Sequence, residues 1–367
     1  MVEAYTEPLG GMVTNPPVVA GIDFGGSKIA VAVCDLAGNR LASGRVAARG
    51  GEGLPAPPRR PGGGSRTGPD GARAIFERGV RTTRELLATA APGRELAAVG
   101  VATFGIPAED RVLLAPAIDG WESLALGREL RAAFPTAAVR MATDVKAAAA
   151  AEYRWGALRG CDPGVYLNLG TGLAAAIVAG GRVINGAAGA AGEIGYNLRA
   201  IADVGLGLGQ RVPLEDAVSG LGLARQLTAR GLARPAGTGP LSAADVLGSG
   251  RDPDLADLAT GFVAELAFHL VNLAIVINPG RIAVGGGMAG SWDRLQPDLE
   301  RALNAGVPFP PELVLAGFPH EAPLIGAVAL AVDAAQDNQA GRDAPNAAAD
   351  LDGHLRPSPA WLARDCS

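Results

Sequence analysis

Cysteine is scarce in this sequence. Its 367 residues include three cysteines, Cys34, Cys161 and Cys366, which lie far apart along the chain. An odd and widely spaced set of this kind provides neither a disulfide framework nor the spacing of metal ligands, so a disulfide-stapled scaffold is excluded. Unpaired cysteines favour a reducing compartment, and we therefore expect the protein in the cytoplasm.

Segments that would send the chain to a membrane are also lacking. The N-terminal stretch MVEAYTEPLGGMVTNPP has no basic region followed by an apolar run, which predicts that it is not a signal peptide. The most apolar long segment, residues 262–277, contains Glu265, His269 and Asn272 and is too short to cross a bilayer. We expect no membrane partner.

Charge is sparse and nearly balanced. Lys and Arg number 32, Asp and Glu number 37, and the formal net charge is −5. This balance lacks the basic excess of a dedicated nucleic-acid-binding protein, so we expect no nucleic-acid partner. The 48% of hydrophobic residues excludes disorder of the whole chain. The length predicts two domains.

Several catalytic signatures are missing. The patterns GxxxxGK[ST], GxSxG and HExxH do not occur, and the three histidines show no spacing typical of a metal site or a catalytic triad. The sequence therefore gives no support to a P-loop enzyme, a serine hydrolase of the GxSxG type or a zinc protease.

Strand-like and helix-like apolar patterns alternate along the chain, which predicts the α/β class. We expect a flexible leader over residues 1–16 and an N-terminal α/β domain over 17–143, in which the Gly/Pro/Arg-rich residues 50–71 form a mobile loop. A C-terminal α/β domain is predicted over 144–335, with a final helix that can pack back on the first domain. Residues 336–367 are polar and are predicted to be a disordered tail.

The first candidate site is a glycine turn between two strand-like segments, Asp23-Phe24-Gly25-Gly26-Ser27-Lys28. Glycines have no Cβ, so their backbone N–H groups can approach phosphate oxygens closely. Asp23 could hold a hydrated metal ion, and Lys28 could help to neutralise phosphate. An ordinary hairpin turn is the alternative, and for this motif alone it is the favoured one.

Two further glycine motifs follow apolar strands. Gly170-Thr171-Gly172 lies between two strand-like segments, and Gly285-Gly286-Gly287 ends the segment RIAVGGG. Glycines at the carboxyl end of a strand leave room for a ligand's ring or ribose, although close helix packing explains them equally well. Two glycine hairpins, one in each half, together suggest a phosphate held between two domains.

Asp144 follows the short strand-like segment VRMAT and begins an alanine-rich helix. Either Thr143 or Asp144 can serve as the helix N-cap, which would be a purely structural role. A carboxylate fixed at this position could also accept a proton from a substrate hydroxyl. The local sequence leaves both roles open.

Taken in order, these motifs resemble the ROK family (repressors, open reading frames and sugar kinases) over about residues 18–335. GIDFGGSK, LGTG and AVGGGM resemble its phosphate and adenosine motifs, and further landmarks are ATFGIP, APAIDGW, DVKAAAAAEYRWGA, GAAGAAGEIGY and LEDAVSG. The resemblance implies a two-domain actin/hexokinase-like (ribonuclease H-like) α/β fold with a cleft, and phosphorylation of a sugar-like hydroxyl with ATP and Mg²⁺. It also implies that Asp144 is the catalytic base, that Glu193 and Glu215 bind substrate hydroxyls, and that the protein is a homodimer.

The sequence departs from the family pattern at its zinc site. Family glucokinases usually contain GEIGH followed by CxCGxxGCxE, which supplies one His and three Cys ligands. Here the corresponding stretch contains Tyr196, Leu206, Leu208, Gly209 and Pro213. We therefore expect no zinc, and we expect apolar packing to replace it.

The sugar-reading positions are altered as well. The Asn that usually precedes the catalytic Asp is Thr143, and the Asn expected after Ala115-Pro116 is Ala117. With Tyr196, these residues suggest an altered substrate. The combination resembles the seven-carbon cyclitol kinases of actinomycete biosynthesis, which implies an antibiotic-pathway enzyme that phosphorylates a primary hydroxyl, such as O7 of 2-epi-5-epi-valiolone.

Two other functions remain in view. The first is a glucokinase or another hexose kinase of primary metabolism. The second is a non-catalytic, sugar-sensing regulator, which is disfavoured because only about 17 Pro/Gly-rich residues precede the first strand and they do not resemble a DNA-binding segment. Retention of Asp23, Asp144 and both glycine turns also argues for catalysis.

Overall fold

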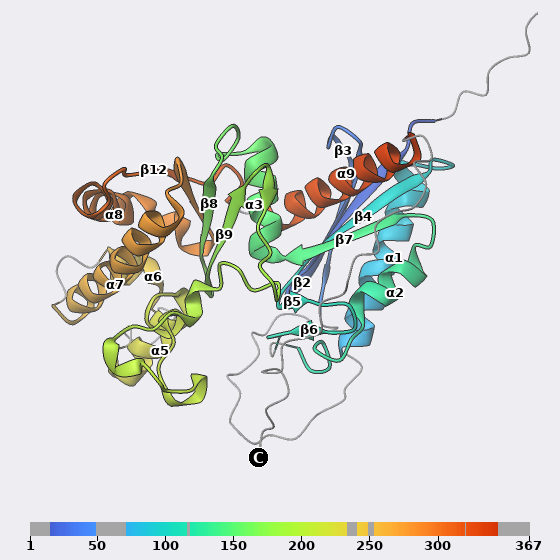
Figure 1. Cartoon of the computed structure of the whole chain (residues 1–367). Helices are drawn as coiled ribbons and strands as arrows, with labels where there is room; N and C mark the ends of the chain where they lie inside the picture. Colours follow the sequence, from blue (N-terminus) through green and yellow to red (C-terminus); the bar gives the residue numbers. More distant parts are fainter. Residues whose placement is uncertain are drawn as a thin grey trace, which may run out of the picture.

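The structure, a computed structural model, describes residues 15–48, 71–115, 118–232, 241–248, 253–319 and 321–343. Most of the predicted leader, nearly all of the predicted loop 50–71 and every residue after 343 lie outside these ranges. Figure 1 shows two groups of strands side by side, with one helix between them and other helices on their outer faces.

The first sheet has the order β3-β2-β1-β4-β7. Three strands form an antiparallel meander, and the last two continue the sheet parallel to the first strand. The glycine turn predicted at residues 23–28 joins the first two strands. The five strands are β1 (Val18–Phe24), β2 (Lys28–Asp35), β3 (Arg40–Ala47), β4 (Leu96–Thr103) and β7 (Ala138–Thr143).

Both faces of this sheet are covered, which explains why β1 is apolar along nearly its whole length. Phe24 points toward helix α1 (Ala72–Ala90), where its ring lies 6.4 Å from that of Phe76. Val19 points to the opposite face and packs with Val328 of helix α9 (Ala322–Asp343). Because successive side chains of β1 point to opposite faces of the sheet, this strand contributes to two separate hydrophobic clusters.

The second sheet repeats the same plan, with the order β10-β9-β8-β11-β12. It again has an antiparallel meander followed by two parallel strands. The glycine turn at residues 170–172 occupies the position that residues 25–27 occupy in the first sheet. The strands are β8 (Gly164–Leu169), β9 (Leu173–Ala179), β10 (Arg182–Val183), β11 (Arg281–Gly285) and β12 (Glu312–Leu315).

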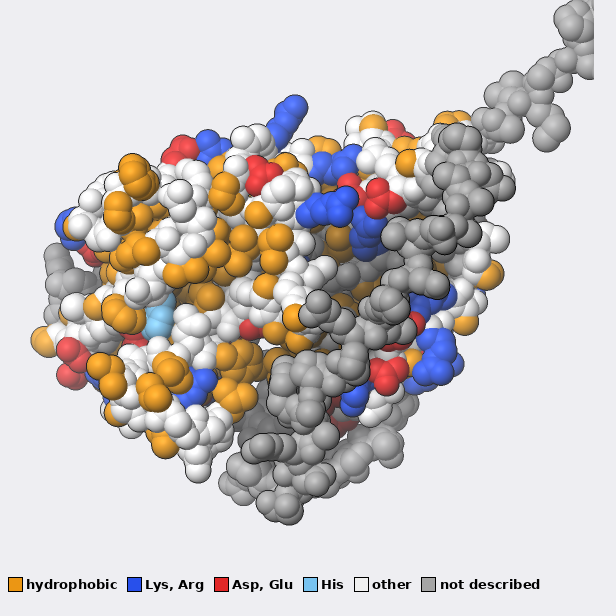
Figure 2. Space-filling model, in the orientation of Figure 1, with side chains coloured by type: hydrophobic (Ala, Val, Ile, Leu, Met, Phe, Trp, Pro, Cys, Tyr) orange, Lys and Arg blue, Asp and Glu red, His pale blue; other side chains and the backbone are white. Residues whose placement is uncertain are grey.

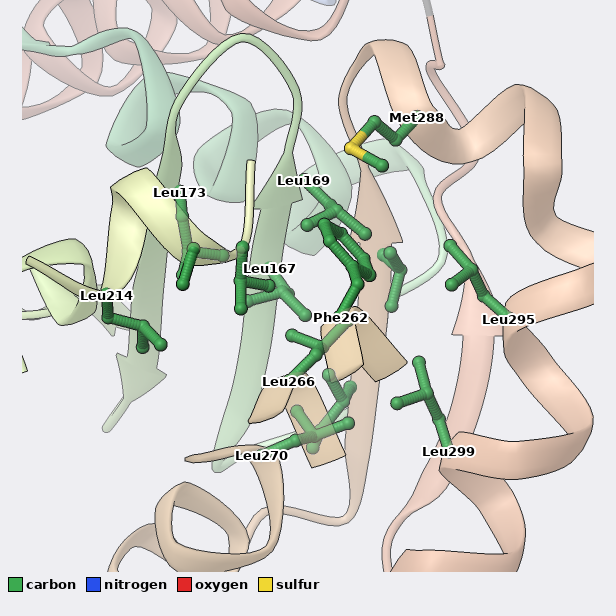
Figure 3. Close-up of a cluster of buried hydrophobic side chains, with 14 of the residues drawn as sticks. Leu167, Leu169, Leu173, Leu214, Phe262, Leu266, Leu270, Met288, Leu295 and Leu299 are labelled. Carbon is green, nitrogen blue, oxygen red and sulfur yellow. The ribbon is translucent and has the colours of Figure 1, made fainter. Parts of the chain in front are cut away.

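The largest hydrophobic cluster lies on one face of this second sheet (Figure 3). Leu167 and Leu169 of β8 pack against helices α7 (Pro253–Ile277) and α8 (Trp292–Gly306). The helix α7 was predicted from its spacing of apolar residues at intervals of three and four, and Phe262, Leu266 and Leu270 form its buried stripe.

Helix α7 is longer than the apolar segment recognised in the sequence. Its 25 residues are apolar enough to cross a membrane by length and composition alone. This differs from the expectation that the segment is too short, because the helix begins at Pro253 and includes two more turns. Its buried stripe nevertheless packs into the core of the second sheet.

The two sheets exchange helices. Helix α3 (Asp144–Trp155) follows the first sheet, yet Ala148 and Ala149 pack with Tyr166 of the second sheet. Helix α9 follows the second sheet and covers the first. The two helices cross so closely that a Cβ on Gly326 would lie 1.8 Å from the carbonyl oxygen of Ala147. The final helix therefore packs back on the first sheet.

Helix α9 also corrects the predicted start of the tail. It continues to Asp343, so residues from Gln336 onward begin as helix instead of as a disordered segment. The residue types there, mainly Gln, Ala, Asp and Arg, are compatible with helix, and the preceding buried turns anchor it.

The remaining elements lie around the cleft or on the outer surface. Two short strands and one helix precede α3, and the other helical elements lie between β10 and α8. They are β5 (Ile106–Pro107), β6 (Val112–Leu113), α2 (Leu126–Ala133), η1 (Ile194–Tyr196), η2 (Ile201–Asp203), η3 (Leu208–Gln210), α4 (Leu214–Ala217), α5 (Gly220–Ala229), α6 (Ala243–Leu247) and η4 (Gly287–Ser291).

Candidate active site

A cleft of about 620 Å³ lies between the two sheets. Its size falls within the range of small-molecule sites. Both halves of the chain contribute to it, which is the arrangement expected if a ligand is held between them. Of the residues predicted from sequence, those that line it are Lys28, Thr143, Asp144, Gly170, Thr171, Gly172, Glu193, Tyr196, Glu215, Gly286 and Gly287.

The junction of β7 and α3 resolves the ambiguity between Thr143 and Asp144. Thr143 is the N-cap of α3, and its Oγ1 accepts a hydrogen bond from the backbone N–H of Lys146 at 3.2 Å. Asp144 is the first helical residue, and its Oδ1 accepts from the N–H of Val145 at 2.8 Å. The capping role therefore falls to Thr143, and the Asp144 carboxylate lies in the cleft.

The electrostatics of Asp144 suit a proton acceptor. Burial raises the pKa of its carboxyl above the ordinary value, although the hydrogen bond from Val145 opposes the shift. A carboxylate with a raised pKa is a stronger base than an exposed one. The geometry therefore permits Asp144 to accept a proton from a hydroxyl bound in the cleft.

The first glycine turn places a second carboxylate nearby. The turn closes through a hydrogen bond from the N–H of Gly25 to the carbonyl oxygen of Lys28 at 3.0 Å. The pKa of Asp23 is raised to about 7, chiefly by burial and secondly by the neighbouring Asp144, whereas Lys28 and Arg45 oppose the rise. A cation beside Asp23 would relieve this unfavourable burial of negative charge.

The second glycine turn is held in place by hydrogen bonds from the start of helix α5. The N–H of Gly220, at the start of α5, donates to the carbonyl oxygen of Gly170 at 2.8 Å, and Leu221 donates to Thr171 at 3.1 Å. Ser219 is the N-cap of α5. The turn therefore projects into the cleft as a fixed backbone feature that carries no ionisable side chain.

Gly286 shows why a glycine follows β11. Its φ is +90°, and a Cβ at this position would lie 2.5 Å from the carbonyl oxygen of Leu169. Only glycine accommodates both the conformation and the close approach. The result brings the turn after β11 against the end of β8, so that Gly286 and Gly170 line one wall of the cleft.

Two glutamates also line the cleft. Glu215, at the start of α4, accepts a hydrogen bond from the N–H of Leu173 through Oε2 at 2.9 Å. Burial raises the pKa of the Glu193 carboxyl, and Asp144 and Glu215 raise it further, while Lys146 opposes them. Carboxylates placed this way can accept hydrogen bonds from hydroxyl groups.

The segment from Tyr196 to Val212 corrects one expectation. Apolar packing was expected where the family has zinc ligands, but Leu206 and Leu208 are 43% and 58% exposed. Polar contacts close the segment instead: the Arg211 guanidinium donates to the carbonyl oxygens of Tyr196 at 2.6 Å and of Asn197 at 3.1 Å. Hydrogen bonds from Arg211 to backbone carbonyl oxygens therefore hold the two ends of this segment together, where packing of apolar side chains was expected to do so.

Two more contacts tie this segment to helix α7. Arg199 forms an ion pair with Glu265, with one N–O distance of 2.8 Å. The side-chain nitrogen of Asn197 lies 3.3 Å from Nδ1 of His269. These contacts are distant in sequence, so local spacing gave no sign of them.

Some predicted residues do not line the cleft. Gly25, Gly26 and Ser27 form the turn that leads to Lys28, which does line the cleft. Asp23 is close enough to Asp144, another lining residue, for the two carboxyl groups to interact electrostatically. A Cβ on Gly285 would lie 2.3 Å from the hydroxyl oxygen of Tyr166, so this glycine accommodates a neighbouring side chain. Ala117 lies outside the described residues.

Two polar residues of β8 were not predicted from the sequence. Tyr166 and Asn168 line the cleft from within a strand that is otherwise apolar. Their signal was the polar side chain itself, since polar groups within a buried strand require partners or a ligand. Other lining residues that were missed are Phe104, Gly105, Ile106, Leu114, Val145, Ala148, Leu173, Ala174, Gly195, Pro213, Pro319, Ala322 and Pro323.

The described residues fit a magnesium ion better than a zinc ion. No group of three or more His, Cys, Asp or Glu side chains that could hold a metal occurs within the described ranges. Magnesium requires fewer protein ligands, because it commonly binds through one or two carboxylates, water and substrate phosphates. Asp23, an oxygen donor whose charge is poorly solvated, is suited to that role.

Comparison with known proteins identifies the family of this chain. A model of the ROK family matches residues 19–334. A kanosamine kinase of Amycolatopsis mediterranei is 32% identical over 65% of this chain and 78% of its own length. A Streptomyces coelicolor glucokinase is 29% identical over 85% of the chain and 96% of its own length. A Brucella melitensis bifunctional enzyme, NanE/NanK, is 33% identical over 71% of the chain, which spans about half of that enzyme.

Solved structures give the same picture of the fold. A ROK hexokinase from Thermus thermophilus superposes with a TM-score of 0.69 at 27% identity, covering 87% of this chain and 99% of that one. A ROK glucokinase from Streptomyces griseus, solved with glucose and AMPPNP, gives 0.61 at 28% identity, covering 85% and 98%. The two-domain hexokinase-like α/β fold predicted from sequence is therefore confirmed.

Proposed function

The chain belongs to the ROK family and is an ATP-dependent carbohydrate kinase, and from this premise we propose that it phosphorylates a primary hydroxyl of a hexose-like cyclic polyol. The favoured acceptor is a seven-carbon cyclitol such as 2-epi-5-epi-valiolone, which would give the 7-phosphate. The observation that carries the proposal is the Asp144 carboxylate, which faces the cleft while Thr143 caps the helix.

Asp144 is the general base of this mechanism. Its carboxylate accepts the proton of the acceptor hydroxyl as that oxygen forms a bond with the γ-phosphorus of ATP, and the bond to the β-phosphate oxygen breaks to release ADP. The raised pKa of Asp144 suits the proton transfer. Glu193 and Glu215 orient the acceptor by accepting hydrogen bonds from its other hydroxyls.

The glycine turns and Lys28 bind the nucleotide. The turn at residues 170–172 and the glycines 286–287 present backbone that a phosphate or ribose can approach closely. Lys28 lines the cleft and offsets phosphate charge. Magnesium, held through Asp23 and water, would supply further neutralisation of the phosphates.

Three residues support an acceptor other than glucose. Thr143 has a shorter side chain than asparagine, and its oxygen already accepts the N–H of Lys146, which leaves its hydroxyl hydrogen and one lone pair to offer a substrate. Tyr196 lines the cleft beside Glu215 and places a phenol there. Ala117 has no side chain that could hydrogen bond.

The alternative function is a hexose kinase. The glucokinases among the relatives support glucose, and the kanosamine kinase supports an amino sugar. A non-catalytic regulator is disfavoured because the proposed base, the second glycine turn and the two glutamates line one cleft, together with Lys28 at the end of the first glycine turn.

An acceptor panel tests the proposal. ADP release with Mg·ATP would be measured for glucose, mannose, fructose, N-acetylglucosamine, kanosamine, inositols and valiolone-type cyclitols. We expect the highest kcat/KM for a cyclitol, because unmatched hydroxyls leave buried polar groups unpaired. Efficient turnover of glucose or kanosamine with inert cyclitols would assign the protein to the alternative function.

We propose, in addition, a cytoplasmic homodimer with a role in secondary metabolism. Cys34 and Cys161 are free thiols, which suits a reducing compartment. Ile201 is 92% exposed, and Figure 2 shows many hydrophobic side chains on the left half of the face in view. Exposed apolar groups of this kind favour a partner surface. Sedimentation should give twice the 36.9 kDa chain mass, and Ile201→Glu should weaken the dimer.

A further inference from the structure

A second cavity, of about 590 Å³, lies on the other side of helix α3 from Asp144. Asp144 and Lys146 are two positions apart, so their side chains leave the helix about 200° from each other. Asp144 lines the cleft already described, whereas Lys146 lines the second cavity. The walls of this cavity come from β7, α3, the β9–β10 hairpin and α9, and therefore from both halves of the molecule.

Lys146 is a buried cation in this wall. Its residue is only 3% exposed, and its ammonium donates to the carbonyl oxygens of Gly189 and of Asn185, the latter at 3.3 Å. Within the described ranges no carboxylate forms an ion pair with it. Buried charges are normally paired, because burial without a counter-charge costs free energy. Accordingly, burial lowers the pKa of Lys146, although Glu193 opposes the shift.

Three arginines share the same cavity. The Arg182 guanidinium is exposed and has no hydrogen bond or ion pair with any residue that the structure describes. Arg140 contacts Asp337 at 2.7 Å, and Arg154 contacts Asp333 at 2.5 Å. A guanidinium has five N–H donors, so one carboxylate contact leaves donors free.

The lining therefore carries four cationic groups against two carboxylates. Burial also raises the pKa of the Asp333 carboxyl, with Arg154 and Arg140 opposing, so its negative charge is not fully developed at low pH. Figure 2 shows Lys and Arg side chains gathered, with carboxylates between them, over the region where α9 and β7 lie in Figure 1. Apolar side chains, among them Val183 and Leu330, complete the lining.

We propose that this cavity is a second ligand site, which binds a small phosphate monoester through Lys146, Arg182 and the free donors of Arg140 and Arg154. A phosphate group fits because arginine forks bind its oxygens in pairs and because a dianion matches the excess of positive charge. The apolar lining accommodates the organic part of the ester. A cation or a neutral sugar would leave this charge unbalanced.

The position of the site connects it to the cleft. Arg140 belongs to the first sheet and Arg182 to the second, so a ligand that contacts both would fix the two halves relative to each other. Lys146 shares helix α3 with Asp144 and tethers the backbone at residues 185–189, just before Glu193. An ester bound here therefore alters turnover without occupying the cleft.

Binding can be measured without kinase activity. Isothermal titration with glucose 6-phosphate, and separately with inorganic phosphate, would use the full chain saturated with Mg·AMPPNP, so that the phosphate-binding turns of the cleft are filled. We expect both probes to bind. Arg182→Glu should weaken both by about tenfold or more, since it replaces a donor with a like charge. Arg182 lies outside the cleft, so its variant should retain basal turnover.

Arg294→Glu is the matched control. Arg294 is an exposed arginine on α8, far from the cavity lining, and the change alters net charge equally. The proposal is overturned if neither probe binds, if only inorganic phosphate binds, or if Arg182→Glu leaves affinity unchanged. An equal loss in Arg294→Glu would also overturn it, because net charge would then explain the effect. Lys146→Met should abolish binding if it folds.

Discussion

The first sheet, β3-β2-β1-β4-β7, and the second sheet, β10-β9-β8-β11-β12, follow the same order along the chain and place a glycine turn in the same hairpin. Their turns differ in chemistry. Asp23 and Lys28 flank the first turn, whereas the second presents Gly170, Thr171 and Gly172 without an ionisable group. The same backbone plan therefore carries charge on one side of the cleft and close-approaching backbone on the other.

The insertions differ even more. Between β10 and β11 lies a long stretch that contains Glu193, Tyr196 and Glu215, whereas the described residues of the corresponding connection between β3 and β4 contribute nothing to the cleft lining. Asp144 lies at the junction, on a helix that leaves one sheet and packs on the other. The comparison suggests that the duplicated sheets serve the phosphate, that the insertion serves the acceptor, and that α3 joins the two.

The largest effect is expected at that junction. Asp144→Asn retains the shape of the side chain but cannot accept the acceptor's proton, so kcat should fall by about 10²–10⁴-fold with a nearly unchanged KM for ATP. Steady-state kinetics with a fixed acceptor would measure this. Retention of most activity in a folded Asp144→Asn protein would remove Asp144 from the mechanism.

The pH profile provides a control for that result. Because burial raises the pKa of Asp144, its carboxyl takes up a proton at a higher pH than an exposed aspartate. As pH falls through this raised pKa, Asp144 is protonated and can no longer act as a base. The wild-type rate should therefore begin to fall at a pH higher than 3.8, the ordinary pKa of an aspartate. The residual rate of Asp144→Asn should lack this component.

The next effect concerns the contact between the exchanged helices. Gly326→Ala places a methyl group 1.8 Å from the carbonyl oxygen of Ala147, so α3 and α9 must move apart. We expect a loss of about 1–3 kcal/mol in unfolding free energy. Gly261→Ala in α7 is the matched control, because open space surrounds that glycine and the change should stabilise the helix by about 0.5–1 kcal/mol. Equal stability of the two variants in urea would contradict the close crossing.

A pair of variants tests the division between phosphate and acceptor. Glu193→Gln should raise the acceptor KM by about tenfold, because a hydrogen bond from a hydroxyl to a charged oxygen becomes a weaker neutral one. Lys28→Met should instead raise the KM for ATP by a similar factor, since a charge near phosphate is lost. The proposed division fails if either variant raises both constants equally.

Local patterns allowed much of the fold to be predicted. Partly alternating apolar residues around a glycine turn predict the hairpin at residues 18–35, and apolar residues at intervals of three and four predict the buried stripe of Phe262, Leu266 and Leu270. The strand order, the exchange of α3 and α9 and the meeting of Asp144 with Glu193 depend on contacts between distant segments. The family resemblance, and not the spacing, predicted that these residues share one cleft.

The contacts that sequence could not reveal are those between an arginine and backbone. Arg211 is joined to residues 196–197, and any residue can supply a carbonyl oxygen, so no partner type marks the contact in advance. The role of Thr143 was ambiguous for a related reason. Threonine and aspartate are both good caps, and only the three-dimensional arrangement shows which side-chain oxygen accepts a hydrogen bond from the backbone N–H of the first helical turn.

The smallest effects are expected at Arg211, whose guanidinium joins the two ends of the segment from Tyr196 to Val212. Arg211→Met removes both guanidinium contacts and frees the segment that carries Tyr196, which should raise the acceptor KM about threefold to tenfold and leave the KM for ATP unchanged. Arg230→Met is the control, because it removes the same charge from an arginine whose contact, an ion pair with Asp257, lies away from the cleft. Hydrogen exchange of residues 197–210 should rise in Arg211→Met alone.

Chelation should have no effect at all, and this separates an arginine-closed segment from a zinc-closed one. Structural zinc sites use thiolate and imidazole ligands, and Tyr196, Leu206, Leu208 and Pro213 offer neither. If Arg211 closes the segment, then treatment with EDTA should leave the melting temperature and the exchange of residues 197–210 unchanged, and metal analysis of untagged protein should find far less than one equivalent of zinc. A segment that loosens on chelation and recovers with added zinc would show that a metal performs the closure, and the insertion would then follow the pattern of the family glucokinases.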